Sequence, residues 1–113
     1  MLDLTMQAIQ SSLDGLAARQ RVIAENLANA ATPGYQARTV SFEDSLRAAV
    51  DRGRPASASI STAPTGAPSA INGNNVSVDQ ETLAMTETGL RYQLATDAMN
   101  NKFRLLGTAI GRG

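Results

Sequence analysis

The stretch AENLANAATPGY, residues 24–35, marks the point at which a long apolar helix must stop. Thr32 precedes a proline, and this position disfavours helical backbone geometry. Asn29 tolerates the left-handed backbone of a helix end and is the expected C-cap. Pro33–Gly34 then supplies the fixed φ and the permissive φ that a type II turn requires. The stretch therefore predicts a helix end followed by a tight turn that redirects the chain at the aromatic Tyr35.

Upstream of this turn, apolar residues recur in alternating steps of four and three, as in a heptad seam. They are Leu2, Met6, Ile9, Leu13, Leu16, Ile23, Leu27 and Ala30, with the polar Gln20 in the same series. The pattern predicts a helix over residues 1–30 whose narrow seam faces another helix, in the same chain or in a partner. An ordinary amphipathic helix of a globular bundle fits the segment as well. Gly15 is expected to weaken this helix by up to about 1 kcal/mol relative to alanine.

Residues 31–78 form the expected insert between two long helices. Ser41 is the expected N-cap of a short helix that ends near Gly53. The small and polar residues of 54–70 predict a loop or a loose pair of short strands, and disorder is the alternative for much of 53–75.

A second long helix is expected over residues 79–113, with Asp79 as its N-cap. Val76 and Val78, just before it, alternate as in a short strand. The ladder of the helix contains Met85, Gly89, Tyr92, Thr96, Met99, Phe103, Leu106 and Ile110. A second apolar row beside the ladder contains Leu83, Leu90, Leu94, Ala98 and Leu105. Two rows make a stripe wider than one partner helix covers, so the excess face is expected to contact other subunits.

These patterns predict a mainly α fold with a thin core, since only 4% of the residues are aromatic. A single core in a chain of this size rarely supplies more than about 3–5 kcal/mol. We therefore expect an isolated subunit that is partly unfolded at both ends and that orders when neighbours cover its apolar faces. The faces expected to assemble contain Leu13, Leu16, Ile23, Leu27, Leu90, Tyr92, Leu94, Met99, Phe103, Leu106 and Ile110.

The composition argues against several classes of function. Ten basic and ten acidic residues balance, which gives no electrostatic footprint for nucleic acid or a membrane surface. Histidine, cysteine and tryptophan are absent from the sequence, which removes disulfides, thiolate chemistry and almost every zinc or copper site. The carboxylates are spread along helix exteriors without a catalytic motif. We expect no enzymatic activity, no cofactor, no metal, no membrane insertion and no cleaved secretory leader.

The motif around the turn resembles the amino-terminal signature of bacterial flagellar axial proteins, the rod and hook family. The residues that carry this resemblance are Ala24, Asn26, Ala28, Asn29, Thr32, Pro33, Gly34 and Tyr35. Residues 73–79 and 90–110 are similar to rod members of the family, and the short middle fits because distal rod and hook members carry larger central domains. Ala31 departs from the pattern, because Asp or Asn is common there in the family.

The resemblance implies a structural subunit of the proximal rod, the drive shaft that crosses the periplasm, assembled by helix packing and needed for motility. Its implied partners are copies of itself, other rod proteins, the MS ring with its rod adaptor subunit, and the flagellar type III export apparatus in transit. It also implies that the chain is exported unfolded and without cleavage of a signal peptide.

The implied architecture pairs residues 1–30 and 79–113 as an antiparallel coiled coil, with 31–78 outside them and in contact with adjacent subunits. Two alternatives stay open. A generic helical-hairpin adaptor accounts for both ladders but not for the turn motif at 32–35. A rod protein of the FlgC type shares the first motif but should lack the pattern at 102–110.

Overall fold

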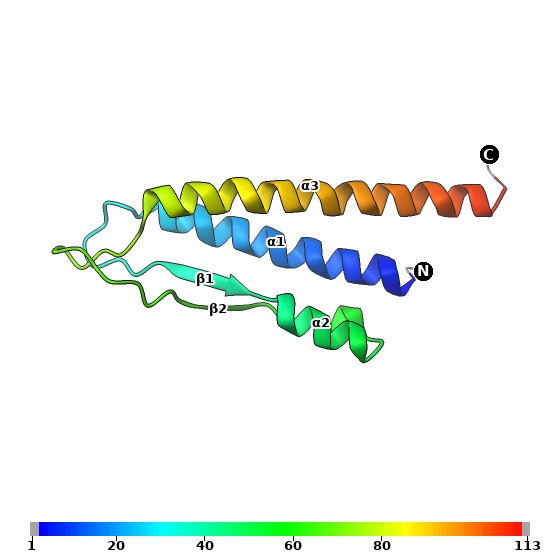
Figure 1. The fold of residues 1–113 in the computed structure, drawn as a ribbon, viewed down its shortest axis with the longest axis horizontal. Coiled ribbons are helices and arrows are strands. Elements are labelled where there is room, and N and C mark those ends of the chain that lie inside the picture. Colours follow the sequence, from blue (N-terminus) through cyan, green and yellow to red (C-terminus); the bar gives the residue numbers. More distant parts are fainter. Residues whose placement is uncertain (1–2, 112–113) are drawn as a thin grey trace.

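The computed structural model describes residues 3–111 of the chain, so Leu2 of the first ladder lies outside the described residues. In order, the elements are α1 (Leu4–Ala28), β1 (Arg38–Ser41), α2 (Glu43–Asp51), the short 3-10 helix η1 (Pro55–Ser57), β2 (Ser61–Pro64) and α3 (Val78–Ala109). The molecule measures 63 × 28 × 15 Å and has three layers, with α1 between α3 and an arm formed by residues 38–64 (Figure 1). The expected mainly α fold with a small insert is confirmed.

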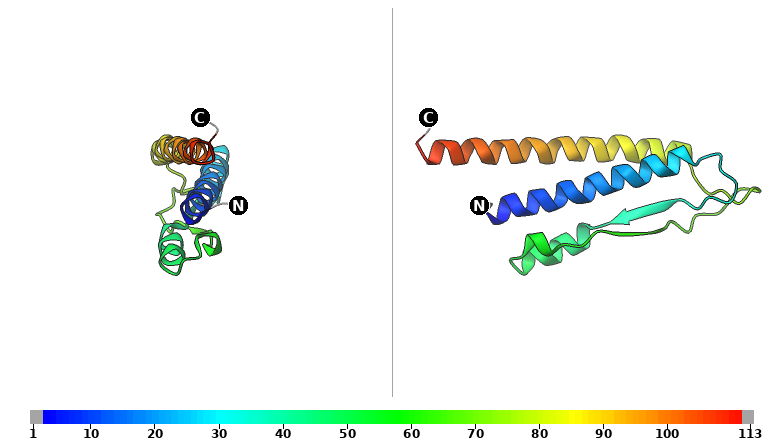
Figure 2. Two further views of the ribbon diagram at one scale, coloured as in Figure 1. Left: turned by 90° about the vertical axis from the view of Figure 1, so that its right-hand side faces the viewer. Right: turned by 180° about the vertical axis from the view of Figure 1, so that it is seen from behind.

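The two long helices lie side by side and run in opposite directions, so both termini lie toward one end of the molecule (Figures 1 and 2). At that end Asp3 caps α1 by accepting a hydrogen bond from the Met6 amide at 2.7 Å. The same carboxylate pairs with Lys102 of α3 at 3.1 Å. Beyond Lys102, α3 continues past the beginning of α1 (Figure 1).

The middle helix α1 is buried on more than one face, which a single narrow seam did not predict. Leu16 of the ladder joins Ala18 and Val22, which lie off the ladder, in the main apolar cluster. Val40 of β1 and Phe42 complete this cluster from the arm. The core therefore joins α1 to the arm, and residues off the heptad positions supply part of it.

Gly15 of α1 lies directly against Phe42 of the arm. A Cβ built on Gly15 would overlap the ring of Phe42, which is 4% exposed. The expectation that Gly15 only weakens the helix was therefore incomplete, because the absent side chain makes room for this ring.

The arm contains a two-stranded antiparallel sheet in which Arg38 lies opposite Pro64 and Val40 lies opposite Thr62. Val40 is buried, whereas every residue of β2 is exposed. A pair of short strands was one of the two predictions for 54–70. That segment does contain one strand, β2, but β2 pairs with β1 at residues 38–41 and not with a second strand within 54–70. Ser41 belongs to β1 and Phe42 occupies the N-cap position of α2, so the predicted Ser41 cap was wrong.

The start of α3 also differs from the prediction. Ser77 is the N-cap, and its hydroxyl accepts a hydrogen bond from the Gln80 amide at 3.3 Å. Asp79 lies in the first turn instead, where its charge favours the helix dipole. Val78 is helical, so the short strand expected at Val76 and Val78 was wrong.

Candidate functional site

The turn after α1 has the geometry of a type II β-turn. The Tyr35 amide donates to the Thr32 carbonyl at 3.2 Å, and Gly34 has φ of 76°. The Gly34 amide, in turn, donates to the carbonyl of Asn72 at 2.9 Å. The turn thus rests against the segment that leads into α3, a contact between parts of the chain far apart in sequence.

Asn26 ties the end of α1 to the arm. Its side chain is fully buried although it is polar. Its Nδ2 donates to the Arg38 carbonyl at 2.9 Å, and its Oδ1 accepts from the Arg38 amide at 3.1 Å. The Tyr35 hydroxyl donates to the same Oδ1 at 3.3 Å. The buried amide is therefore satisfied by the chain that it positions, as a buried polar group must be.

Two further buried asparagines hold the turn from the other side. Asn74 donates from Nδ2 to the carbonyls of Asn29 at 2.9 Å and Thr32 at 2.7 Å. Asn75 accepts at Oδ1 from the Ala37 amide, at 2.6 Å. These bonds tie the segment before α3 to the turn and to the start of the arm. We call Asn26, Asn74 and Asn75 the asparagine clamp.

The other predicted motif residues lie at the edge of this clamp. Asn29 is the C-cap of α1, and its Nδ2 donates to the Glu25 carbonyl at 2.9 Å on the surface. The Thr32 hydroxyl donates to Asn29 Oδ1 at 3.1 Å, and Pro33 is exposed. Sequence reasoning singled out Asn26 but missed the roles of Asn74 and Asn75, although both lie in the stretch 73–79 that resembles rod members of the family.

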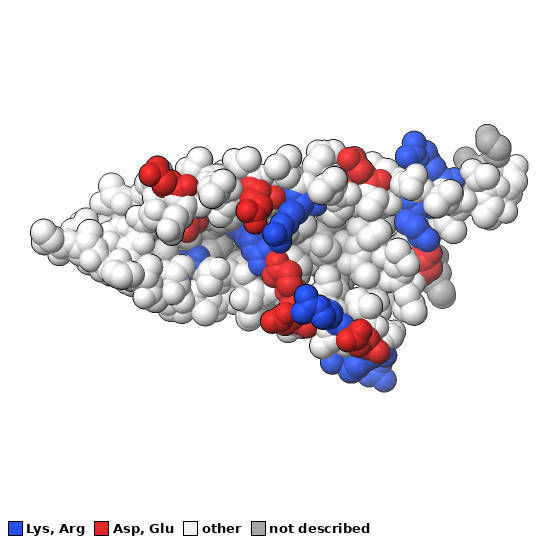
Figure 3. All heavy atoms as spheres, viewed as in Figure 1, with Lys and Arg blue, Asp and Glu red and all other residues white. Residues whose placement is uncertain are grey.

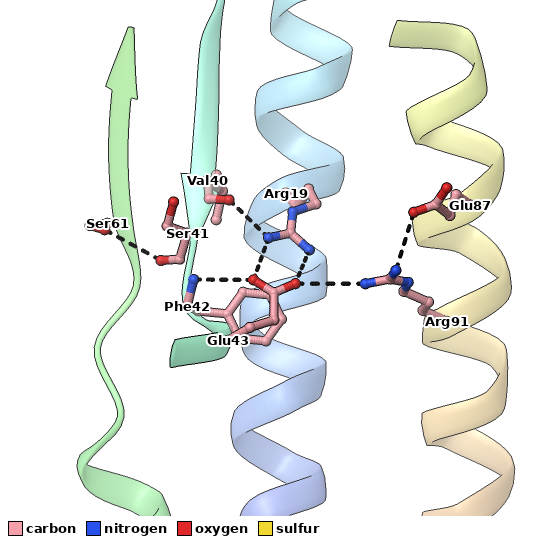
Figure 4. A network of polar contacts seen from close by, with 8 residues as sticks. All are labelled: Arg19, Val40, Ser41, Phe42, Glu43, Ser61, Glu87 and Arg91. Atoms are coloured by element: carbon pink, nitrogen blue, oxygen red, sulfur yellow. Dashed lines mark hydrogen bonds and ion pairs between the residues drawn. The ribbon is translucent and has the colours of Figure 1, made fainter. Parts of the chain in front are cut away.

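An ion-pair network joins the three layers at mid-length (Figure 4). Arg19 of α1 donates to both carboxylate oxygens of Glu43, at 2.6 and 2.7 Å, and to the Val40 carbonyl at 2.8 Å. From α3, Arg91 approaches Glu43 at 3.7 Å and Glu87 at 3.2 Å. Figure 3 shows the corresponding band of charged side chains crossing the face from α3 to α2. No sequence pattern pointed to this network, because its members are distant in the chain.

Glu43 is the residue whose ionisation this network changes most. The Arg19 hydrogen bonds lower the pKa of Glu43 from 4.5 to about 2, against a smaller opposing effect of burial. Arg19 also lies 4.9 Å above the centre of the Phe42 ring. The network thus fixes the start of α2 on α1 by charge, hydrogen bonding and stacking together.

The residues predicted to form assembly faces divide into two groups. Leu16, Ile23 and Met99 are buried within the subunit, and Leu13 and Leu27 are partly buried. The exposed group lies on α3 and its C-cap and ranges from 40% to 70% exposure; it contains Leu90, Tyr92, Leu94, Phe103, Leu106 and the C-cap Ile110. Leu83 and Leu105 of the second row are exposed as well. We call these eight residues the outer row of α3.

The described part of the chain shows no constellation for bound-ligand chemistry. Across residues 3–111, no three histidine, cysteine or acidic side chains gather as metal ligands would. Over the same residues, no helix has the length and apolar character needed to cross a bilayer. The groove between α1, β1 and α3, of about 330 Å³, is lined by the ion pairs of Arg19 and Arg91. The features that remain are a clamped turn and uncovered apolar surface.

Comparison with known proteins agrees with these features. A family model of flagella basal body rod proteins matches residues 6–36, which hold most of α1 and the turn. Flagellar basal body rod protein FlgB of Escherichia coli is 32% identical over 91% of this chain and 90% of its own length. FlgB of Bacillus subtilis is 31% identical over 96% of this chain and 95% of its own length. FlgB of Salmonella typhimurium is 28% identical over 91% of this chain and 90% of its own length. The chain therefore belongs to the FlgB family of flagellar basal body rod proteins.

Proposed function

We propose that this chain is a structural subunit of the flagellar basal body rod and supports motility in that role. The observation that carries the proposal is the similarity to FlgB of Escherichia coli over 91% of the chain. A structural role also fits the molecule, because its described residues present exposed apolar side chains on α3 and a hydrogen-bonded turn after α1. We include the absence of enzymatic activity and of a cofactor in the proposal.

Assembly in this proposal uses the two long helices and the arm differently. α1 and α3 pair as an antiparallel coiled coil, and neighbouring rod subunits cover the outer row of α3. Uncovered leucines of this kind favour association, because each buried Leu side chain gains about 1.5–3 kcal/mol. The asparagine clamp fixes the direction in which residues 38–64 leave α1, so that the arm meets an adjacent subunit. The motif residues serve assembly through this geometry; they are Asn26, Asn29, Thr32, Pro33, Gly34 and Tyr35.

The finer placement follows from the resemblance of the motifs. We propose a position in the proximal rod, within the periplasm, with copies of this chain, other rod proteins and the MS ring with its adaptor subunit as neighbours. Passage through the flagellar type III export apparatus belongs to the same proposal.

Two other functional assignments explain fewer of the observed features. A generic helical-hairpin adaptor leaves the clamped turn at residues 32–35 without a role. A rod protein of the FlgC type is less favoured, because relatives named FlgB match 91% and 96% of this chain and 90% and 95% of their own lengths.

Complementation of a strain that lacks its own copy of this gene tests the proposal. We expect the wild-type chain to restore swimming and to appear as rod density in electron micrographs of purified basal bodies. Leu94→Glu, in the outer row at 69% exposure, should leave the circular dichroism of the purified chain unchanged and abolish swimming. Asn100→Glu, also exposed on α3, is the matched control and should swim. A complete rod in the uncomplemented strain would reject the proposal.

A further inference from the structure

The loop that leads into α3 contains Asn72, the only asparagine of the sequence that a glycine follows. Glycine has no side chain, so its main-chain nitrogen can approach the side chain of the preceding residue without steric hindrance. Asn72 is exposed, and water therefore reaches its side chain. This combination is the one in which an asparagine side chain reacts spontaneously with its own main chain.

The reaction joins the main chain of Gly73 to the side chain of Asn72. The Gly73 nitrogen attacks the side-chain carbonyl carbon and forms a C–N bond, while the displaced amino group takes up the proton of the Gly73 amide and leaves as ammonia. The product is a cyclic succinimide, which water opens at either of its carbonyl carbons. Opening at one carbon gives aspartate. Opening at the other gives isoaspartate, in which the main chain runs through the former side chain and is longer by one carbon atom.

The folded loop opposes the first step, because it engages both reacting groups. The Gly73 amide donates to the Ala70 carbonyl at 2.9 Å, so the proton that must leave is held in a hydrogen bond. The Asn72 Oδ1 accepts from the Asn74 amide at 3.1 Å, which fixes the orientation of the side chain that must be attacked. Unfolding removes both bonds, and the reaction is then faster.

The same loop has little room for a longer main chain. The Asn72 carbonyl accepts from the Gly34 amide at 2.9 Å. Two residues later, the Asn74 Nδ2 donates to the Thr32 carbonyl at 2.7 Å. Between these two anchors Gly73 lies close to Gly34, since a Cβ added to Gly73 would be 3.3 Å from the Gly34 Cα. An additional main-chain carbon between Asn72 and Gly73 therefore displaces at least one of the anchors.

We propose that Asn72 is a site of spontaneous deamidation, that the folded loop slows the reaction, and that its isoaspartate product releases the turn after α1. The bonds that Asn26 makes to Arg38 join α1 to β1 and stay in place. The bonds across the loop, from Gly34 to Asn72 and from Asn74 to the turn, are the ones that weaken. This inference does not depend on the rod function, because it concerns the isolated chain.

Peptide mapping of the purified full chain by mass spectrometry measures the reaction in mildly alkaline buffer, with and without guanidinium chloride. In the denatured chain we expect Asn72 to deamidate before every other asparagine. In the folded chain its rate should be lower by at least about tenfold, since the loop must first open. A methyltransferase specific for isoaspartate should label the product. Equal rates in the two conditions would overturn the protective role of the loop, and earlier reaction of another asparagine in the denatured chain would overturn the site.

The effect on the turn is tested with the isoaspartate form after its chromatographic separation from the unmodified chain. Its urea midpoint should be lower than that of the wild type, and its Gly34 amide should exchange faster in hydrogen-exchange measurements by nuclear magnetic resonance. Asn72→Asp is the matched control, because it carries the same charge on an unaltered main chain and keeps an oxygen that can accept from the Asn74 amide. It should retain the wild-type midpoint and Gly34 exchange. Equal behaviour of the isoaspartate form and Asn72→Asp would overturn the release of the turn.

Discussion

The side-chain amide of Asn26 pairs with both main-chain polar groups of Arg38, donating to the carbonyl at 2.9 Å and accepting from the amide at 3.1 Å. The Asn26 side chain thereby makes the two hydrogen bonds to Arg38 that the main chain of a neighbouring strand would otherwise make along β1. Because each partner satisfies the other, the bond pair fixes the distance between α1 and the arm as well as the direction of the strand.

Replacing Asn26 with leucine should lower the free energy of unfolding by about 2 kcal/mol, because the main-chain groups of Arg38 and the Tyr35 hydroxyl lose their partner. Urea unfolding followed by circular dichroism measures the change. Asn29→Ala is the matched control, since Asn29 bonds at the surface, and it should cost less than about 1 kcal/mol. Equal losses in the two variants would contradict the role assigned to the buried amide.

Gly15→Ala should destabilise the chain by about 1–3 kcal/mol although alanine is the better helix former, because the new methyl group would overlap the Phe42 ring. Gly107→Ala is the control in the other helix, since no described atom lies within 4 Å of a Cβ added there. It should leave stability unchanged or raise it by up to about 1 kcal/mol. Thermal unfolding of both variants gives the comparison, and a stabilised Gly15→Ala would refute the close contact.

The stability of the chain should fall with acidification in a window set by Glu43. Its folded-state pKa, about 2, lies below the ordinary 4.5, so the stabilisation is complete above pH 4.5 and is lost as the pH falls toward 2. Urea unfolding at a series of pH values should show a shallower decline over this window in Glu43→Gln than in the wild type. Asn100→Gln, which changes an exposed uncharged position of α3, is the control and should keep the wild-type slope. Identical slopes in all three proteins would remove Glu43 as the cause.

Replacing both Pro33 and Gly34 with alanine should leave α1 intact but block rod assembly. An L-residue at the Gly34 position is strained by φ of 76°, and the turn would lose its geometry. Far-ultraviolet circular dichroism should show unchanged helix content, while complemented cells should fail to swim. Normal motility of the double mutant would show that the turn is dispensable.

The sequence predicts the helices well because their signals are local. Each signal involves only residues that are close together in the chain. This holds for the four-and-three spacing of the apolar residues, for the proline–glycine turn and for the small residues that follow it. Asn29 as the cap of α1 followed from the same local reasoning. The positions of the two long helices could therefore be expected to within a few residues.

The rest depends on contacts between distant segments. Ala18 and Val22 are buried because the arm folds back over α1, and nothing in the heptad spacing indicates that layer. Asn75 meets Ala37 across 38 positions of sequence, so its role appears only when the chain is folded. The Ser41 cap failed for the same reason, since pairing with Ser61 draws that residue into a strand.

The part of α3 beyond Lys102 gives the subunit a direction. About seven residues, or roughly 10 Å of helix, project past the beginning of α1 at one end, whereas the other end closes in loops. A subunit with a projecting helix at one end and a tapered end of loops at the other presents different surfaces to its neighbours when its direction is reversed. Any column of such subunits joined head to tail therefore has a distinguishable front and back, and growth at its two ends involves different surfaces.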